Sequence, residues 1–497
     1  MASAINHGEI TEILLERSPL NRQQGNNFQM SVLLSGLYGM VVYLQSIAFL
    51  TMYIINLSNG ASYKSDDVFN IYTSVVFTFA IIWMIGDAIY INAKSSEIAM
   101  EKSVVCSVYL KGGLVVFGFT AVLIAVLDMA VFNDDRVYDF TTTLRIIYVV
   151  LEMAYLINYS DVCVTQQCAI RRFGLMHIMV ANLKDMTMNV IINAGLKDIV
   201  PNPTSPFLHP NDTALIKSWR AVRPYLLVCR LQYSFIAAGT VVIMWYVVGK
   251  PLQNQVKNIL TSSKRRQSSW VSSVGLILGC GSIVGTIIAT IISDSEVDNR
   301  SCPVDITYYN LRLTLNLTTV VSVIFLLIYF PRYYRLPQFQ TAFQLDEAII
   351  LLCLFFYVLQ EMFGNLSLVS YVVDDRKCYL RSTVLDALLT LLRIVLQTLL
   401  IIQSLRLTAT GNSTECFRSV LLFLSIVNLA WWIISLTELN NNQHIYRTQK
   451  ELFGKGTFNV IHGITGPFVV FYHYQSSVCI FEMWSANNFE VSVDKRQ

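Results

Sequence analysis

The sequence predicts an all-helical protein that crosses a membrane many times, and three observations support this fold class. Of its 497 residues, 54% are hydrophobic and only 14% are charged, against about 25% charged in ordinary soluble domains. Apolar runs of about 20 residues or more recur along the chain, and each is long enough to cross a bilayer as a helix. The short alternating segments of a membrane β-barrel are absent. We therefore expect a polytopic α-helical membrane protein.

The apolar runs number twelve. They lie at residues 30–55, 69–93, 104–131, 141–164, 174–194, 222–248, 270–292, 308–330, 345–373, 383–407, 417–439 and 458–484. The longest connection, 195–221, contains four prolines and is predicted to be an extended loop. The chain then divides into a tail at 1–29, an N-terminal half at 30–248, a linker at 249–269, a C-terminal half at 270–484 and a tail at 485–497.

Basic residues predict the orientation. The linker carries five of them, Lys250, Lys257, Lys264, Arg265 and Arg266. Since cytoplasmic loops are rich in Lys and Arg, we expect the linker in the cytoplasm. An even number of spans then puts both termini there, and the first run is expected to act as an uncleaved anchor.

The predicted external loops carry features that fit this orientation. Glycosylation sequons begin at Asn56, Asn211 and Asn299, all on the predicted external side, while a fourth at Asn412 falls on the cytoplasmic side. Cys302 and Cys378 lie in external loops, and a disulfide between them is one hypothesis that spacing alone does not settle.

The two halves read as copies of each other. Tyr233 and Tyr472 each precede a Trp by twelve residues (245 − 233 and 484 − 472). Upstream, Glu152 matches Gln397 and Asn182 matches Asn428, at offsets of 245 and 246 (397 − 152 and 428 − 182). These matches predict a duplicated six-helix unit, arranged as parallel repeats. Each copy then offers one polar trio: Glu152, Asn182 and Tyr233, or Gln397, Asn428 and Tyr472.

Several segments resemble the otopetrins, a family of proton channels. They are GGLVVFGF at 112–119, RFGLMHIMVANL at 172–183, QYSFIAAG at 232–239, LQTLLI at 396–401, FLSIVNLAWWIISLTEL at 423–439 and the run from Pro467 to Trp484. The resemblance implies an acid-responsive, proton-selective channel of the plasma membrane. It also implies a homodimer, with the trios inside the two helix bundles and lipid or sterol as a filling of one bundle.

This chain departs from the family pattern at four positions. Glu152 stands where the family has Gln, Gln232 stands where it usually has Glu, and His473 and Gln475 replace the usual Arg and His of the last helix. These departures leave the location of the pore as the resemblance implies it. They bear on pH dependence and gating.

Ionisable groups within the spans are the candidate proton relays. A charged carboxylate at the bilayer centre costs about 2.5–3.5 kcal/mol on insertion scales, so Glu152 is expected to serve a function or to bond a neighbouring helix. Polar groups within spans also act as interhelical hydrogen bonds of about 0.6 kcal/mol. The remaining relay or pH-sensing candidates are His473, Gln232, Gln475, Glu361, His177, Asp386 and Arg393. Asp386 and Arg393 lie two turns apart on one helix face, and we expect them to pair with other helices.

Small residues at Gly275, Gly279, Ser282 and Gly285 form a stripe that predicts close helix packing between halves or subunits. No nucleotide-binding loop, metalloprotease motif, nucleophile elbow or haem motif occurs. The sequence therefore predicts neither an enzyme nor a cofactor. It has no CxxC pair that would indicate a zinc site, and its net charge of +3 is too small to indicate a nucleic-acid partner. Two other functions stay open, a twelve-helix proton-coupled secondary transporter and a non-conducting member with a structural or regulatory role.

Overall fold

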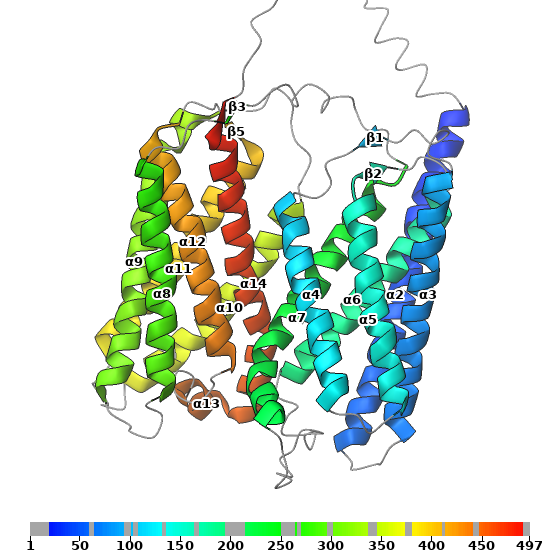
Figure 1. Ribbon diagram of the computed structural model, residues 1–497, viewed down its shortest axis with the longest axis horizontal. Helices are drawn as coiled ribbons and strands as arrows, with labels where there is room; N and C mark the ends of the chain where they lie inside the picture. The colour runs from blue at the N-terminus through cyan, green and yellow to red at the C-terminus, as the bar shows by residue number, and fades with distance from the viewer. Residues whose placement is uncertain are drawn as a thin grey trace, which may run out of the picture. The chain divides into compact units, whose positions relative to one another are not determined.

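The computed structural model of the protein consists almost entirely of long helices (Figure 1). It describes residues 19–58, 64–93, 101–102, 108–131, 136–163, 168–193, 214–249, 264–265, 270–295, 302–335, 345–372, 380–409, 413–440 and 447–490. In the N-terminal half the helices are α2 (Pro19–Ser58), α3 (Lys64–Ala93), α4 (Val108–Val131), α5 (Arg136–Tyr159), α6 (Cys168–Asn193) and α7 (Ala214–Val247). In the C-terminal half they are α8 (Trp270–Ser295), α9 (Cys302–Tyr333), α10 (Leu345–Val372), α11 (Leu380–Arg406), α12 (Glu415–Asn440), α13 (Arg447–Phe453) and α14 (Lys455–Asn488).

The all-helical membrane class predicted from the sequence is confirmed, but the count of twelve spans is not. Within the described residues, ten helices are long and apolar enough to cross a membrane. Two predicted spans, 174–194 and 458–484, lie in α6 and α14, which are not among those ten. Both helices carry many polar side chains that the fold buries, such as Arg172 and Asn182 in α6 and His473 and Gln475 in α14. Buried polar groups lower the hydropathy of a helix without exposing it to lipid.

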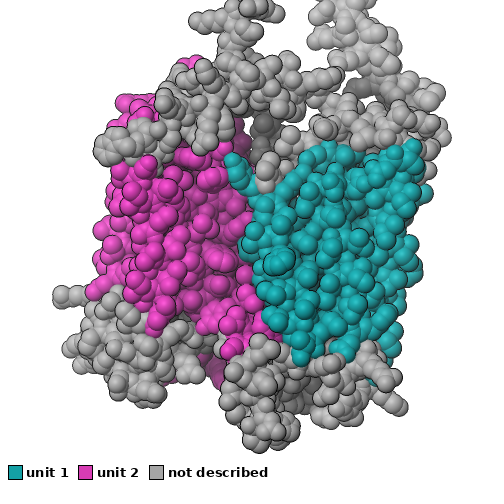
Figure 2. Space-filling view, in the orientation of Figure 1, with its two compact units in different colours: residues 1–188, 203–205, 233–254 teal, residues 189–202, 206–232, 255–497 magenta. Residues whose placement is uncertain are grey.

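The chain forms two compact units (Figure 2). Unit 1 contains residues 1–188, 203–205 and 233–254, and unit 2 contains residues 189–202, 206–232 and 255–497. The boundary runs through α7, whose residues from Tyr233 onward belong to unit 1.

The two units repeat the same helix pairings. In unit 1, α3 packs on α5, α4 on α5 and α2 on α3. In unit 2 the corresponding pairs, α9 with α11, α10 with α11 and α8 with α9, are also in contact. Each half therefore builds the same local framework around its fourth helix, α5 or α11.

Short antiparallel strand pairs repeat along with the helices. Strand β1 (Glu101–Lys102), which follows α3, pairs with β2 (Val162–Cys163), which follows α5. Strand β4 (Tyr334–Arg335), which follows α9, pairs with β5 (Thr408–Ala409), which follows α11. The register is the same in both, since the first residue of one strand faces the second residue of its partner. A third pair joins β3 (Lys264–Arg265) to β6 (Phe489–Glu490) within unit 2.

Glycines on α8 pack against a neighbour inside unit 2. A side chain at Gly275 would overlap the backbone of Ser419, and one at Gly279 would overlap Ile426, both on α12. Two residues of the predicted small-residue stripe, Gly275 and Gly279, therefore serve a contact between α8 and α12 within one half. Around Gly281 and Gly285 there is open space. Small residues here let two backbones approach closely, as is common between membrane helices.

Candidate functional site

The predicted trio of the N-terminal half meets inside unit 1. Asn182 Nδ2 of α6 donates a hydrogen bond to Glu152 Oε1 of α5 at 2.5 Å, and the Tyr233 hydroxyl of α7 donates to Glu152 Oε2 at 2.8 Å. Tyr148, one turn before Glu152, donates its hydroxyl to Oε1 at 2.9 Å. All four side chains are buried. We call Tyr148, Glu152, Asn182 and Tyr233 the N cluster.

Local sequence features position the N cluster. Tyr148 and Glu152 are four residues apart and so lie on one face of α5. Asn182 also donates to the Ile178 carbonyl at 3.1 Å, which fixes its amide on α6. A side chain at Gly118 of α4 would overlap Met153 and Tyr233, so this glycine lets α4 pack directly against the cluster.

Charged residues of unit 1 lie beside the N cluster. Arg145 Nε and Asp185 Oδ1 form an ion pair at 3.4 Å, one turn from Tyr148 and Asn182 respectively. The Lys184 ammonium lies 4.3 Å from the centre of the Phe77 ring, an arrangement in which the ring face attracts the cation. The described contacts of Glu152 itself are hydrogen bonds from neutral donors. Its carboxylate is thus hydrogen-bonded but not ion-paired.

In the predicted trio of the C-terminal half, only two of the three side chains hydrogen-bond to each other. Gln397 Nε2 of α11 donates to Asn428 Oδ1 of α12 at 2.9 Å, and Asn428 Nδ2 donates back to Gln397 Oε1 at 3.4 Å. Tyr472 of α14 bonds to the Thr398 hydroxyl at 2.9 Å and to the Ile394 carbonyl at 3.0 Å, instead of bonding to Gln397. These side chains are buried. We call Gln397, Thr398, Asn428 and Tyr472 the C cluster.

Hydrogen bonds from side chain to backbone recur at the repeat spacing. Tyr233 donates to the Val149 carbonyl at 3.3 Å and Tyr472 donates to the Ile394 carbonyl, which is 245 residues further along (394 − 149). Asn182 and Asn428 each donate to the carbonyl four residues before them on their own helix. The duplicated unit therefore keeps the placement of its Tyr and its Asn relative to the backbone.

Arg393 takes the place of Tyr148 in the C-terminal half, because their separation is also 245 (393 − 148). Its Nη2 donates to the Tyr357 hydroxyl of α10 at 2.7 Å, and its guanidinium lies 4.2 Å from the Trp431 ring centre. His473 Nε2 is 3.2 Å from the same Tyr357 hydroxyl, and its ring stacks on Trp431. Arg393 and His473 are both fully buried.

An ionic network lies in the same unit. Arg312 of α9 forms ion pairs with Asp386 of α11, at 3.2 Å from its Nε, and with Glu438 of α12. Asn316 donates to Asp386 Oδ1 at 2.6 Å and to the Thr390 hydroxyl at 2.9 Å. We call Arg312, Asp386, Glu438 and Asn316 the Arg312 network. Asp386 therefore pairs with another helix, whereas Arg393 bonds to the Tyr357 hydroxyl and lies over the Trp431 ring.

The other predicted relay residues make no described side-chain hydrogen bond to either cluster. Glu361 is partly exposed on α10, within electrostatic range of Arg312 and Arg393. Gln475 donates to Asp346 Oδ1 at 2.8 Å. His177 is buried and bonds through Nδ1 to the Tyr38 hydroxyl at 2.9 Å and through Nε2 to the Val76 carbonyl at 3.0 Å. Gln232 is fully buried, with no hydrogen bond to its amide in the described part of the chain.

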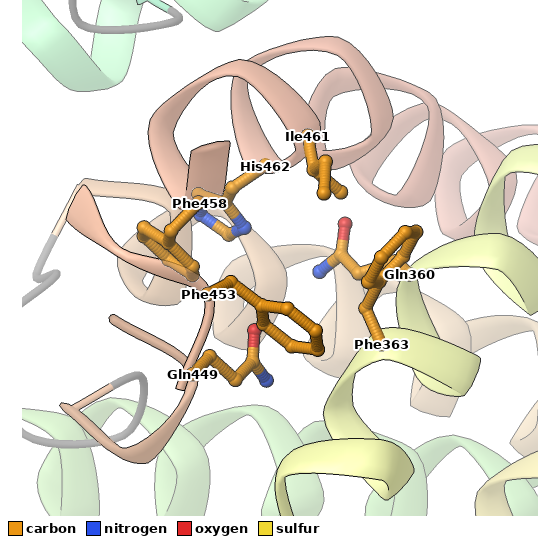
Figure 3. Close-up of a pocket in the computed structure, with 7 residues that line it drawn as sticks. All are labelled: Gln360, Phe363, Gln449, Phe453, Phe458, Ile461 and His462. Carbon is orange, nitrogen blue, oxygen red and sulfur yellow. The ribbon is translucent and has the colours of Figure 1, made fainter. Parts of the chain in front are cut away.

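A small cavity lies at the α13 end of unit 2 (Figure 3). Its volume is about 10 Å³, which is room for about one water. Helices α10, α13 and α14 supply its walls, which are Gln360, Phe363, Gln449, Phe453, Phe458, Ile461 and His462. Its lining combines two amides and one imidazole with four apolar side chains, so this is a cavity of water size with a mixed lining (Figure 3).

Several predicted sites are not described. Cys378, Asn211 and Asn299 lie outside the described residues, and the side chains of Asn56 in α2 and Cys302 in α9 lie outside them as well. The predicted disulfide and glycosylation sites therefore stay predictions.

Sequence reasoning missed Tyr148, Thr398, Tyr357 and Arg312. Tyr148 and Tyr357 could have been found, because each precedes a predicted glutamate by four residues and so shares its helix face. Thr398 and Arg312 act through residues that are distant in sequence, and no local spacing identifies them.

Fold and site together define a polytopic helical membrane protein with buried polar clusters in two similarly packed units. The otopetrin family model matches residues 109–203 and 207–474, well over half of the chain. The protein therefore belongs to the otopetrin family. It is also similar to the proton channel OtopLc of Drosophila melanogaster, with 23% identity over 448 residues. That alignment covers 76% of this chain and 27% of the fly protein, so the chain spans about a quarter of the length of this relative.

Proposed function

We propose that the protein is a proton-selective channel whose conducting paths run through the polar interiors of its six-helix halves. The observation that carries this proposal is the N cluster, a buried carboxylate held by three neutral donors from three helices. A carboxylate is costly inside a membrane, and the carboxylates that occur there usually serve a function. Family membership and the similarity to a proton channel support the same conclusion.

Protons need hydrogen-bonding groups at close spacing and no wide pore. Carboxyl, hydroxyl and amide groups supply them here, at distances of 2.5 to 3.4 Å within the clusters. Close packing beside the N cluster, where Gly118 lets α4 touch Tyr233, leaves little room for a hydrated metal ion. Selectivity for protons would then follow from pore size and from the lining groups.

The same proposal covers the membrane, the orientation and the oligomeric state of the protein. It would lie in the plasma membrane with both termini in the cytoplasm, as an acid-responsive homodimer with lipid or sterol filling one of its bundles. The continuous helix α14, which runs through Pro467 without a break, supports a channel over a secondary transporter, since transporter sites typically use discontinuous helices.

Whole-cell recording tests the function. Cells that express the protein are expected to show a current whose reversal potential follows the proton gradient when sodium, potassium and chloride are exchanged. The double variant Glu152→Ala/Gln397→Ala removes one hydrogen-bonding side chain from each cluster. It is expected to reduce that current about tenfold or more at equal surface expression, because positioned proton-transfer groups contribute at least that much. A saturating, substrate-coupled flux in place of the current would instead indicate a transporter.

A further inference from the structure

We propose that protons pass between the N cluster and one end of unit 1 through a second buried site, formed by Tyr155 of α5, Asp87 of α3 and Arg171 of α6. This inference rests on the proposed function and names a further step of its path. The Tyr155 hydroxyl donates to Asp87 Oδ2 at 2.7 Å, and Arg171 Nε lies 3.6 Å from the same oxygen. The three side chains are at most 8% exposed. We call them the Asp87 site.

The Asp87 site continues a row of polar side chains that contains Glu152. The residues of this row are three or four apart along α5 and so share one face of the helix. In order they are Arg145, Tyr148, Glu152, Tyr155 and Tyr159. Tyr155 follows Glu152 by one turn, a rise of about 4.5 Å along the helix axis. A proton that leaves Glu152 along this face therefore meets the Asp87 site next.

The Asp87 site lies near the end of unit 1 that carries strands β1 and β2 (Figure 1). Asp87 is six residues before the end of α3 (93 − 87), Tyr155 is four before the end of α5 (159 − 155), and Arg171 is three after the start of α6 (171 − 168). One turn beyond Tyr155, the Tyr159 hydroxyl accepts a hydrogen bond from Nδ2 of the exposed Asn92 at 2.9 Å. The row of polar groups thus connects the buried N cluster to this end, which the predicted orientation places in the cytoplasm.

Two features distinguish the Asp87 site from a structural ion pair. Arg171 Nε and Nη1 have no hydrogen-bond partner in the described part of the chain, whereas strong arginine–carboxylate pairs bond at about 2.7–2.9 Å and often through two atoms. At the repeat offsets, Tyr155 corresponds to Leu400 and Arg171 to Phe417 (400 − 155 = 245 and 417 − 171 = 246). Leu400 and Phe417 are fully buried. The shared framework therefore packs at these positions without polar groups, so the fold alone does not require them.

The Asp87 site can transfer a proton without consuming any other reactant. The Tyr155 oxygen takes a proton from a hydronium ion on the side of the N cluster, while its own hydroxyl proton passes to Asp87 Oδ2. The hydronium ion becomes water, the hydroxyl is restored and the carboxylate becomes an acid. The acid then gives its proton to a water at the end of unit 1, and the carboxylate returns. Arg171 balances the charge of that carboxylate, which would otherwise be an isolated buried ion.

Close packing beside Tyr155 favours protons over larger ions. A side chain at Gly174 of α6 would overlap Trp83 of α3, so these two helices are in tight contact. The Trp83 ring stands edge-on to the Tyr155 ring, with 6.1 Å between their centres. This packing leaves little room for a hydrated metal ion, and pore size is one source of selectivity in channels.

Current recording on the full-length protein tests this path. Tyr155→Phe removes the hydroxyl and keeps the ring, and it is expected to lower the proton current as far as Glu152→Ala does at equal surface expression. The loss is at least about twofold, because removal of a proton-transfer group stops one path even where the other half carries an equal share. Combining Tyr155→Phe with Glu152→Ala is expected to lower the current no further, since residues that act as one unit are not additive.

Tyr72→Phe is the matched control. Tyr72 lies on α3, and its hydroxyl also joins two helices, by bonds to Ser46 Oγ at 2.8 Å and to the Val42 carbonyl at 3.2 Å, but it is outside the polar row of α5. This variant is expected to conduct like the wild type. A full current in Tyr155→Phe, an equal loss in Tyr72→Phe, or losses that multiply in the combined variant would overturn the Asp87 site alone. A wild type without proton current would overturn the proposed function as well.

A pair of charge variants separates transfer from folding. Asp87→Asn leaves Arg171 buried without its counter-charge, so a loss of surface expression in this variant has a structural cause. Adding Arg171→Gln removes both charges and is expected to restore expression without restoring the current. A wild-type current in that double variant would show that the ion pair serves only the fold, and would overturn the path. Tyr155→Phe leaves the ion pair intact, so its current tests the path independently of these two variants.

Discussion

Units 1 and 2 share a framework and differ in the chemistry that it holds. Both pack their third, fourth and second helices in the same pairs and close them with a two-residue strand pair in the same register. Their Tyr and Asn side chains bond to equivalent backbone carbonyls. In contrast, the side-chain partners have changed, from a carboxylate with three donors in unit 1 to paired amides in unit 2.

This difference shows which contacts define the fold and which define function. Bonds to backbone carbonyls need only the helix to be present, so they persist when neighbouring side chains change. Bonds between side chains need both partners, and a single substitution replaces the chemistry. In this protein a duplicated scaffold has therefore been able to hold an acid in one copy and a guanidinium in the other.

The largest expected effect comes from the Arg312 network of unit 2. Replacing Arg312 with Met leaves Asp386 and Glu438 buried without their cation. Removing one partner of a buried ion pair costs about 3–5 kcal/mol. We expect Arg312→Met to lose most folded, surface-expressed protein, as measured by size-exclusion chromatography of the detergent extract.

Two further substitutions test whether unpaired buried charge causes this loss of folded protein. Adding Asp386→Asn and Glu438→Gln to Arg312→Met removes the unpaired charges and is expected to recover much of the folded protein. If Arg312→Met alone elutes and melts like the wild type, the network contributes nothing to the difference between the two units.

Much of this architecture follows from sequence, for physical reasons. Apolar runs predict helices because a backbone in lipid must satisfy its own hydrogen bonds. The repeat offsets predict Glu152, Asn182 and Tyr233 as one polar trio, and the structure brings these three side chains together. The sequence also predicted spans in α6 and α14, which are not among the ten candidate spans, since both helices carry polar side chains that the fold buries.

The side-chain hydrogen-bond and ion-pair partners in the C-terminal half could not be predicted from the sequence. Gln397 and Tyr472 match their counterparts in spacing, yet Tyr472 bonds to Thr398 whereas Gln397 bonds to Asn428. Arg312 and Glu438 are 126 residues apart in the chain. Which distant helix supplies a counter-charge depends on packing, and spacing within one helix does not encode it.

An intermediate effect is expected when the two matched tyrosines lose their hydroxyls. Tyr233→Phe removes a donor from the buried Glu152 carboxylate, and an unsatisfied buried polar group costs about 1–3 kcal/mol. Tyr472→Phe removes bonds to the Thr398 hydroxyl and to a carbonyl, a loss of about 0.5–1.5 kcal/mol. Thermal melting in detergent is expected to show the larger decrease for Tyr233→Phe. Equal decreases would mean that the two clusters are energetically alike.

The smallest effect is expected from ion pairs at the ends of the helices, and exposure decides its size in each unit. In unit 1, Lys111 Nζ bonds Asp161 Oδ2 at 2.6 Å, with the Asp161 side chain 37% exposed. Asp161→Asn is therefore expected to cost no more than about 1 kcal/mol, the usual limit for exposed pairs.

In unit 2, Arg406 pairs with Glu347, whose side chain is only 3% exposed. Arg406→Gln leaves that buried carboxylate without its cation and is expected to lower the melting temperature further than Asp161→Asn does. The reverse order, measured in the same detergent and salt, would show that exposure of the acid does not set the contribution of these pairs.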